Sequence, residues 1–168
     1  MENINNTEEK QDIFDKLVHL KIFRWFEPFY KKNKEMLMYL FFGVLTTAVS
    51  FVTAGIAKAI LENAGFSTKI VSSASTAFSW ICAVTFAYTT NRIWVFNSKA
   101  KGIKEITKEA AAFYGGRAST GIFEVLFMWA GNGLLHFGYW ITKIAANVIV
   151  LILNYVISKL LVFKKKEN

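Results

Sequence analysis

Four long apolar stretches fill the sequence between residues 36 and 165, and they restrict strongly what the chain can fold into. A helix that crosses a bilayer needs about 20 predominantly apolar residues. The stretches are Leu37–Ala57, Ile70–Thr90, Ala110–Leu135 and Trp140–Phe163. The first two carry no charge, whereas the third contains Arg117 and Glu124 and the fourth contains Lys143 and Lys159. We therefore expect an all-α integral membrane protein with four transmembrane helices, at about 37–60, 70–91, 110–135 and 140–163.

The composition agrees with a membrane domain at 36–165 behind a polar N-terminal segment at 1–35. The chain is 54% hydrophobic and 16% aromatic, and its one proline, Pro28, lies outside all four stretches. The first apolar run is too long for a cleavable signal peptide. Within the first segment, Ile13–Tyr30 has apolar residues at helical spacing between lysines and arginines. This pattern predicts an amphipathic helix on the inner membrane surface, the alternative being a partly helical tail.

The positive charges indicate the orientation in the membrane. The net charge is +8, and the basic clusters at 31–34, 92–108 and 164–166 each border the end of a stretch. With four spans all three clusters fall on one side, which the positive-inside rule assigns to the cytoplasm. We expect both termini in the cytoplasm, and this distribution argues against a nucleic-acid partner.

The second half of the chain resembles a degenerate copy of the first. Tyr88–Phe96 ends the second stretch, and Tyr155–Phe163 ends the fourth 67 positions later with matching Tyr, Arg/Lys, Val and Phe. Phe41–Gly43 likewise resembles Phe113–Gly115, at an offset of 72. We expect two weakly repeated hairpins related by an axis along the membrane normal. The alternative is chance, because these residue types are common at membrane borders.

Small residues form a stripe on the second stretch. Ser72, Thr76, Ser79, Ala83 and Thr90 share one helical face, and small residues at such spacing let helices approach closely in lipid. We expect this stripe to pack against another helix.

Charged and polar residues lie on one face of the third stretch. Arg117, Thr120, Glu124 and Asn132 fall within about 120° of one another, and Arg117 lies about 10 Å along the axis from Glu124. One interpretation is an internal ion pair that orients the helices. The other is a polar pathway in which Arg117 meets an anion and Glu124 tunes it or carries a proton. Charges at this depth are usually paired or functional.

The fourth stretch has a narrower polar face. Lys143, Asn147, Asn154 and Ser158 fall within about 60° of helix circumference, which suggests a groove inside the bundle. Lys143 could instead extend to lipid headgroups. No metal-ligand spacing, phosphate loop or nucleophile motif is present, so we expect no enzyme activity, no cofactor and no metal.

The sequence resembles the GtrA-like proteins. The resemblance covers about Met36 to Lys165 and is carried by Tyr39–Thr47, by the Asn91–Phe96 ending and by the Asn154…Phe163 ending. Members are small bacterial membrane proteins linked to glycosylation of cell-surface polymers. The resemblance implies flipping of a polyprenyl-phosphate-linked sugar across the cytoplasmic membrane, often for wall teichoic acid. Members often carry an acid in the first span near Ser50, so any acidic role here would shift to Glu124.

The implied ligand has an anionic head, a polar sugar and a long apolar tail. The residues expected to serve it are Arg117, Lys143, Arg92 and Asn91 near the phosphate, Asn147, Asn154, Asn132 and Thr120 near sugar hydroxyls, and Glu124 as the tuning acid. Arg92 could also simply mark the membrane boundary. Four helices form a thin bundle, so we expect a homo-oligomer with pathway glycosyltransferases as partners. Two alternatives remain, a non-transporting partner that anchors a glycosyltransferase and a small four-helix exporter relying on Glu124.

Overall fold

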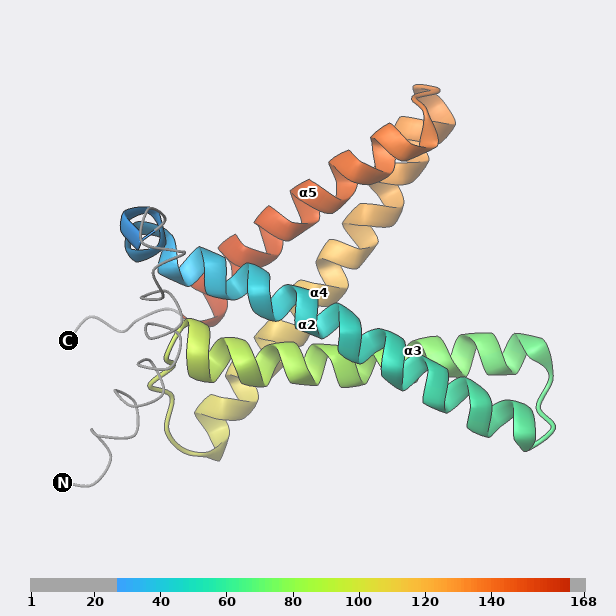
Figure 1. Cartoon of the computed structure of the whole chain (residues 1–168), viewed down its shortest axis with the longest axis horizontal. Helices are drawn as coiled ribbons and strands as arrows, with labels where there is room; N and C mark the ends of the chain where they lie inside the picture. Colours follow the sequence, from blue (N-terminus) through green and yellow to red (C-terminus); the bar gives the residue numbers. More distant parts are fainter. Residues whose placement is uncertain (1–26, 164–168) are drawn as a thin grey trace. The chain divides into compact units, whose positions relative to one another are not determined.

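A computed structural model describes residues 27–163, with side chains from residue 33 onward except that of Asn132. The described chain is all-α (Figure 1). Its helices are α2 (Glu27–Asn63), α3 (Thr68–Thr90), α4 (Ile103–Met128) and α5 (Tyr139–Ile157), and wider π-helical turns follow the last three as η2 (Asn91–Val95), η3 (Trp129–Leu134) and η4 (Ser158–Val162). The four expected helices are confirmed. The expected amphipathic helix lies outside the described residues, apart from the positions that belong to α2.

Within residues 27–163, three helices are long and apolar enough to cross a membrane, namely Asn33–Asn63, Thr68–Val95 and Tyr139–Val162. The backbone at Asn33 is non-helical, with φ −118° and ψ 20°, so a kink separates the start of α2 from its apolar part. α4 is not among the three because Arg117, Glu124 and several small polar residues lower its mean hydropathy. A membrane span at 110–135 therefore remains a prediction.

The chain divides into two compact units between Asn97 and Ser98. The first contains the hairpin of α2 and α3 followed by η2, and the second contains the hairpin of α4 and α5 with η3 and η4 (Figure 1). The tight link between α2 and α3 uses Gly65, whose φ of 77° is a left-handed conformation that glycine adopts without strain. The two-hairpin organisation is confirmed.

The repeat is visible in the packing of the two units. The buried polar or small positions Ser75, Ser79, Ala87 and Asn91 in the first hairpin have buried counterparts 67 positions later, Thr142, Ala146, Asn154 and Ser158. The π-helical turns η2 and η4 end in the same way, since the amide N–H groups of Phe96 and Phe163 donate to the fifth carbonyl before them at 2.9 and 2.8 Å. The two hairpins are therefore structural copies with diverged sequences.

The aromatic packing changes the alignment of the repeat between α2 and α4, the first helix of each hairpin. Tyr39 packs on Phe96 with ring centroids 6.3 Å apart, and Phe113 packs on Phe163 at 5.9 Å. Tyr39, not Phe41, is therefore the counterpart of Phe113, and the offset is 74 rather than 72. Phe41 is 47% exposed, whereas Phe113 is 1% exposed. The aromatic doublets alone could not show which ring faces the partner helix.

The contact row on α3 also differs from the expected stripe. Ser79, Ala83 and Thr90 are buried as expected, but Ser72 and Thr76 are exposed. Contacts with α2 instead follow every fourth residue, through Val71, Ser75, Ser79, Ala83, Ala87 and Asn91. A row of every fourth residue is inclined to the helix axis, so helices that cross at an angle touch along it and leave the straight stripe.

Candidate functional site

A buried polar contact joins α4 to α5. The Thr120 hydroxyl donates to Oδ1 of Asn154 at 2.8 Å, and the two residues are 3% and 6% exposed. An unpaired amide oxygen at this depth would lose several kcal/mol of hydration without compensation. The bond therefore makes Asn154 tolerable in an apolar helix and fixes the register of α4 against α5.

An ion pair between Glu124 and Lys143 lies on the same hairpin. The Lys143 ammonium donates to Oε1 of Glu124, and the two side chains remain 35% and 26% exposed, respectively. Glu124 is thus paired with Lys143 rather than with Arg117, so the Arg117–Glu124 pair considered from the sequence is wrong. Extension of Lys143 to lipid headgroups stays a prediction. A charged pair in a membrane helix is neutral overall, and this lowers the cost of holding each charge there.

Two glycines bring the backbone of the α4 segment close to α5. A Cβ atom added at Gly116 would lie 2.8 Å from Cγ2 of Ile157, and one added at Gly131 would lie 2.6 Å from Cγ2 of Thr142. Real Cβ atoms essentially never approach so closely, so both positions require glycine unless a neighbour moves. This close packing holds the two polar contacts in one narrow seam.

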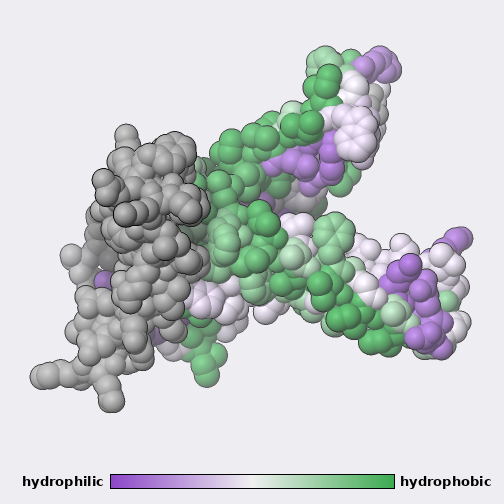
Figure 2. Space-filling model, in the orientation of Figure 1, coloured by the Kyte–Doolittle hydropathy of each residue, from purple (hydrophilic) through white to green (hydrophobic). Residues whose placement is uncertain are grey.

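Arg117 lies one turn before Thr120 on α4 and is half-buried. Its guanidinium carbon is 5.3 Å from the centroid of the Phe113 ring, a cation–π arrangement. Phe113 is itself held by Phe163. Along the hairpin, then, Arg117 comes first, the Thr120–Asn154 hydrogen bond second and the Glu124–Lys143 pair third. A hydrophilic patch interrupts the hydrophobic surface of this hairpin (Figure 2).

The remaining expected residues are not gathered into this seam. Asn147 is exposed, although the sequence placed it on one face with Asn154, which is buried. The contact row of α5 again follows every fourth residue, through Thr142, Ala146, Asn154 and Ser158, and so leaves Asn147 outside. The side chain of Asn132 is outside the described part.

Asn91 and Arg92 belong to the first unit, in η2. Asn91 is 2% exposed, its Nδ2 donates to the Ala87 carbonyl at 2.7 Å, and its Oδ1 has no hydrogen-bond partner among the described residues. Arg92 donates to the Tyr88 hydroxyl at 3.0 Å, just as Lys159 in the second unit donates to Tyr155 at 3.2 Å. π-Helical turns often occur at functional sites.

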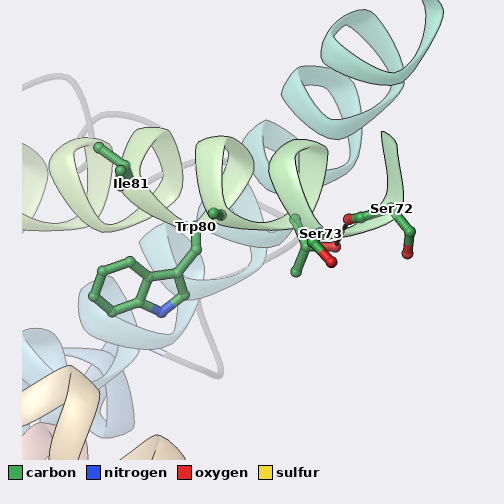
Figure 3. A pocket seen from close by; sticks show the side chains of 6 residues that line it. Ser72, Ser73, Trp80 and Ile81 are labelled. Carbon is green, nitrogen blue, oxygen red and sulfur yellow. Dashed lines mark hydrogen bonds between the residues drawn. The ribbon is translucent and has the colours of Figure 1, made fainter. Parts of the chain in front are cut away.

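Sequence reasoning missed one feature of α3. Six of its residues line an open groove of about 720 Å³, namely Ser72, Ser73, Thr76, Ala77, Trp80 and Ile81 (Figure 3). The signal was available, because Ser72, Thr76 and Trp80 recur every four residues. The helix contact expected from the stripe of small residues does not include Ser72 and Thr76, which are exposed.

Helical hairpins with three apolar span-length helices and a polar seam define a multi-pass membrane protein. The chain belongs to the family of the GtrA/DPMS transmembrane domain, which matches residues 38–163. The resemblance noted from the sequence is thereby confirmed, and the match includes α4 together with the three apolar helices.

The chain is similar to several bacterial proteins over nearly their whole length. It is 34% identical over 150 residues to the cell wall teichoic acid glycosylation protein GtcA of Listeria monocytogenes, covering 88% of this chain and 99% of that protein. The protein of the same name from Listeria innocua is 36% identical over 141 residues, covering 83% and 92%. The uncharacterized membrane protein YwcD of Bacillus subtilis is 33% identical over 131 residues, covering 78% and 98%. No solved structure matches the chain.

Proposed function

We propose that this protein moves a polyprenyl-phosphate-linked sugar from the cytoplasmic to the outer leaflet of the bacterial cytoplasmic membrane. The sugar would then modify a cell-surface polymer such as wall teichoic acid, the process for which the Listeria relatives are named. The observation that carries the proposal is the charged and hydrogen-bonded seam between α4 and α5, within a domain of a transmembrane family. On this proposal both termini lie in the cytoplasm.

The seam suits the charge of such a lipid. A phosphate that enters from the cytoplasmic side meets Arg117 first, whose planar fork binds phosphate oxygens in pairs. It then competes with the Glu124 carboxylate for the Lys143 ammonium. The Glu124–Lys143 pair keeps the lysine compensated while no lipid is bound, and the exchange of one anion for another leaves it compensated during passage.

Polar residues of both units contact the sugar or the phosphate in this proposal. Asn147 lies one turn from Lys143, and its exposed amide can meet sugar hydroxyls beside the phosphate. Asn132 belongs to η3, nearer the tip of the hairpin, and is assigned to the sugar there. Thr120 and Asn154 serve sugar hydroxyls only by exchanging the hydrogen bond that joins them. Asn91 and Arg92, at the cytoplasmic end of α3, serve a lipid phosphate at the membrane border. A pathway glycosyltransferase and a second copy of the chain complete the working assembly.

The test is translocation by the purified full chain in liposomes, with no glycosyltransferase present. Undecaprenyl phosphate carrying a defined sugar is placed in one leaflet, and its appearance in the other is followed by a membrane-impermeant sugar oxidant. We expect wild-type protein to transfer the lipid and Lys143→Ala to lose at least about tenfold in rate. Lys58→Ala is the matched control, because Lys58 forms an exposed pair with Glu62 at the hairpin tip, 3.7 Å apart.

The same assay decides between carrier and anchor. If wild-type protein moves no lipid-linked sugar with any of several sugars, the carrier proposal fails. An anchoring partner of a glycosyltransferase would then be the better explanation, and it predicts that the seam variants lower co-purification of the enzyme.

A further inference from the structure

The groove on α3 has a lining suited to a sugar. Three of its six lining residues carry hydroxyls, one is Trp80, and none is charged (Figure 3). Trp80 is 42% exposed. Binding sites for small polar ligands typically combine an apolar or aromatic wall with a few convergent polar groups.

The hydroxyls of the groove have bonding capacity to spare. Thr76 donates its proton to the Ser72 carbonyl at 2.8 Å, which leaves its oxygen able to accept. The hydroxyls of Ser72 and Ser73 have no partner among the described residues. All three residues are exposed, because the contact row with α2 passes through Ser75 instead. Packing against α2 within this hairpin therefore does not account for them.

The internal repeat relates this face of α3 to residues of α5 that the proposed function assigns to the ligand. The counterparts of Ser72, Ser73, Thr76 and Trp80, 67 positions later, are Tyr139, Trp140, Lys143 and Asn147. Tyr139, Trp140 and Asn147 are exposed, whereas Lys143 is paired with Glu124 of α4. The proposed function places the lipid headgroup beside Lys143 and Asn147. The two hairpins thus present corresponding faces, each with at least one aromatic ring.

The two faces differ in charge. Thr76 stands where α5 has Lys143, and Ser50 stands where α4 has Glu124 in the register set by Tyr39 and Phe113. The first hairpin therefore carries two hydroxyl residues at the positions of the charged pair in the second hairpin. A face without charge binds a phosphate weakly, because charge-assisted hydrogen bonds are the strong ones. Its hydroxyls can still form hydrogen bonds with the neutral hydroxyls of a sugar.

We propose that the α3 groove is a second headgroup site, which binds the neutral sugar ring of a polyprenyl-phosphate-linked sugar. The ring lies against the Trp80 indole, and the hydroxyls of Ser72, Ser73 and Thr76 bond to the sugar hydroxyls. The groove lies at the end of α3 away from η2, which is the outer-leaflet end in the proposed orientation. This inference rests on the proposed function for the identity of its ligand.

Tryptophan fluorescence of the full chain in nanodiscs tests the inference. Trp80 is kept as the only tryptophan, and the others are replaced by phenylalanine at Trp25, Trp94, Trp129 and Trp140. Phospholipids brominated in the acyl chain quench an exposed indole on contact. Three lipids are then added separately: undecaprenyl phosphate, the same lipid carrying glucose, and the same lipid carrying glucuronic acid.

We expect the glucose-bearing lipid to lower the quenching of Trp80 at least about twofold, with the other two lipids much weaker. Thr76→Val should weaken the apparent affinity of the glucose lipid about fivefold, because one hydroxyl partner is lost. The matched control is Phe78→Ala, an exposed residue outside the groove, which should leave the affinity unchanged.

Three results would overturn the inference. The first is equal protection by all three lipids, and the second is protection by none. The third is a fall in quenching by the brominated phospholipids when more copies of the protein are placed in each nanodisc, before any polyprenyl lipid is added. That result would make this face a contact between two copies of the chain.

Liposome transport by the same preparations separates this inference from the proposed function. Protection without transport would retain the groove as a sugar site and reject the carrier. Normal transport without protection would reject the groove alone.

Discussion

Breaking the Glu124–Lys143 pair should destabilise the protein more than breaking an exposed pair of the same type. Coulomb attraction at about 4 Å is worth about 4 kcal/mol at an effective dielectric constant near 20, before desolvation is subtracted. Removing one partner of a fully buried pair loses about 3–5 kcal/mol. Because the side chains of Lys143 and Glu124 are 35% and 26% exposed, we expect each of Glu124→Gln and Lys143→Met to lose about 1–2 kcal/mol of unfolding free energy.

A double-mutant cycle measures this pair directly. Unfolding of the wild type, both single variants and the double variant is followed by circular dichroism in mixed micelles of rising denaturing-detergent content. The double variant should be more stable than the sum of the single losses predicts, by about 1 kcal/mol, since it leaves no charge uncompensated. A parallel cycle on Lys58 and Glu62 should show less than about 0.5 kcal/mol. Strict additivity at Glu124 and Lys143 would refute the pairing.

Three further results are expected. Arg117→Ala should abolish surface glycosylation with near-normal protein level while Arg117→Lys keeps part of it, as quantified by lectin binding to cells; loss of activity that only follows loss of protein would make the residue structural. Gly131→Ala should lower unfolding free energy by about 1–3 kcal/mol because its new Cβ would lie 2.6 Å from a side chain on α5, whereas Gly121→Ala, with nothing within 4 Å, should not. In a background without the native cysteine, a cysteine at Gly138 should react with an impermeant thiol reagent in whole cells and one at Lys101 should not; the reverse pattern would invert the topology.

The lengths and composition of the apolar stretches were sufficient to predict the helices. A helix satisfies its own backbone hydrogen bonds, so about 20 apolar residues in a row predict a helix regardless of its neighbours. The repeated endings at Tyr88–Phe96 and Tyr155–Phe163 were also readable, because local sequence determines a local turn. The sequence likewise predicts that Arg117, Glu124 and Lys143 lie at membrane depth.

Only the tertiary structure decided which of these side chains meet. A single helix gives the angle between its own residues but not the angle at which another helix crosses it. Because both hairpins pack along rows of every fourth residue, the contact face rotates around α3 and α5. That rotation buries Asn154 yet exposes Asn147, and it leaves Ser72 and Thr76 in an open groove rather than a helix contact. The partner of Glu124 was equally undetermined, since Arg117 and Lys143 are both cations, and only the packing of α5 against α4 brings the lysine to the carboxylate.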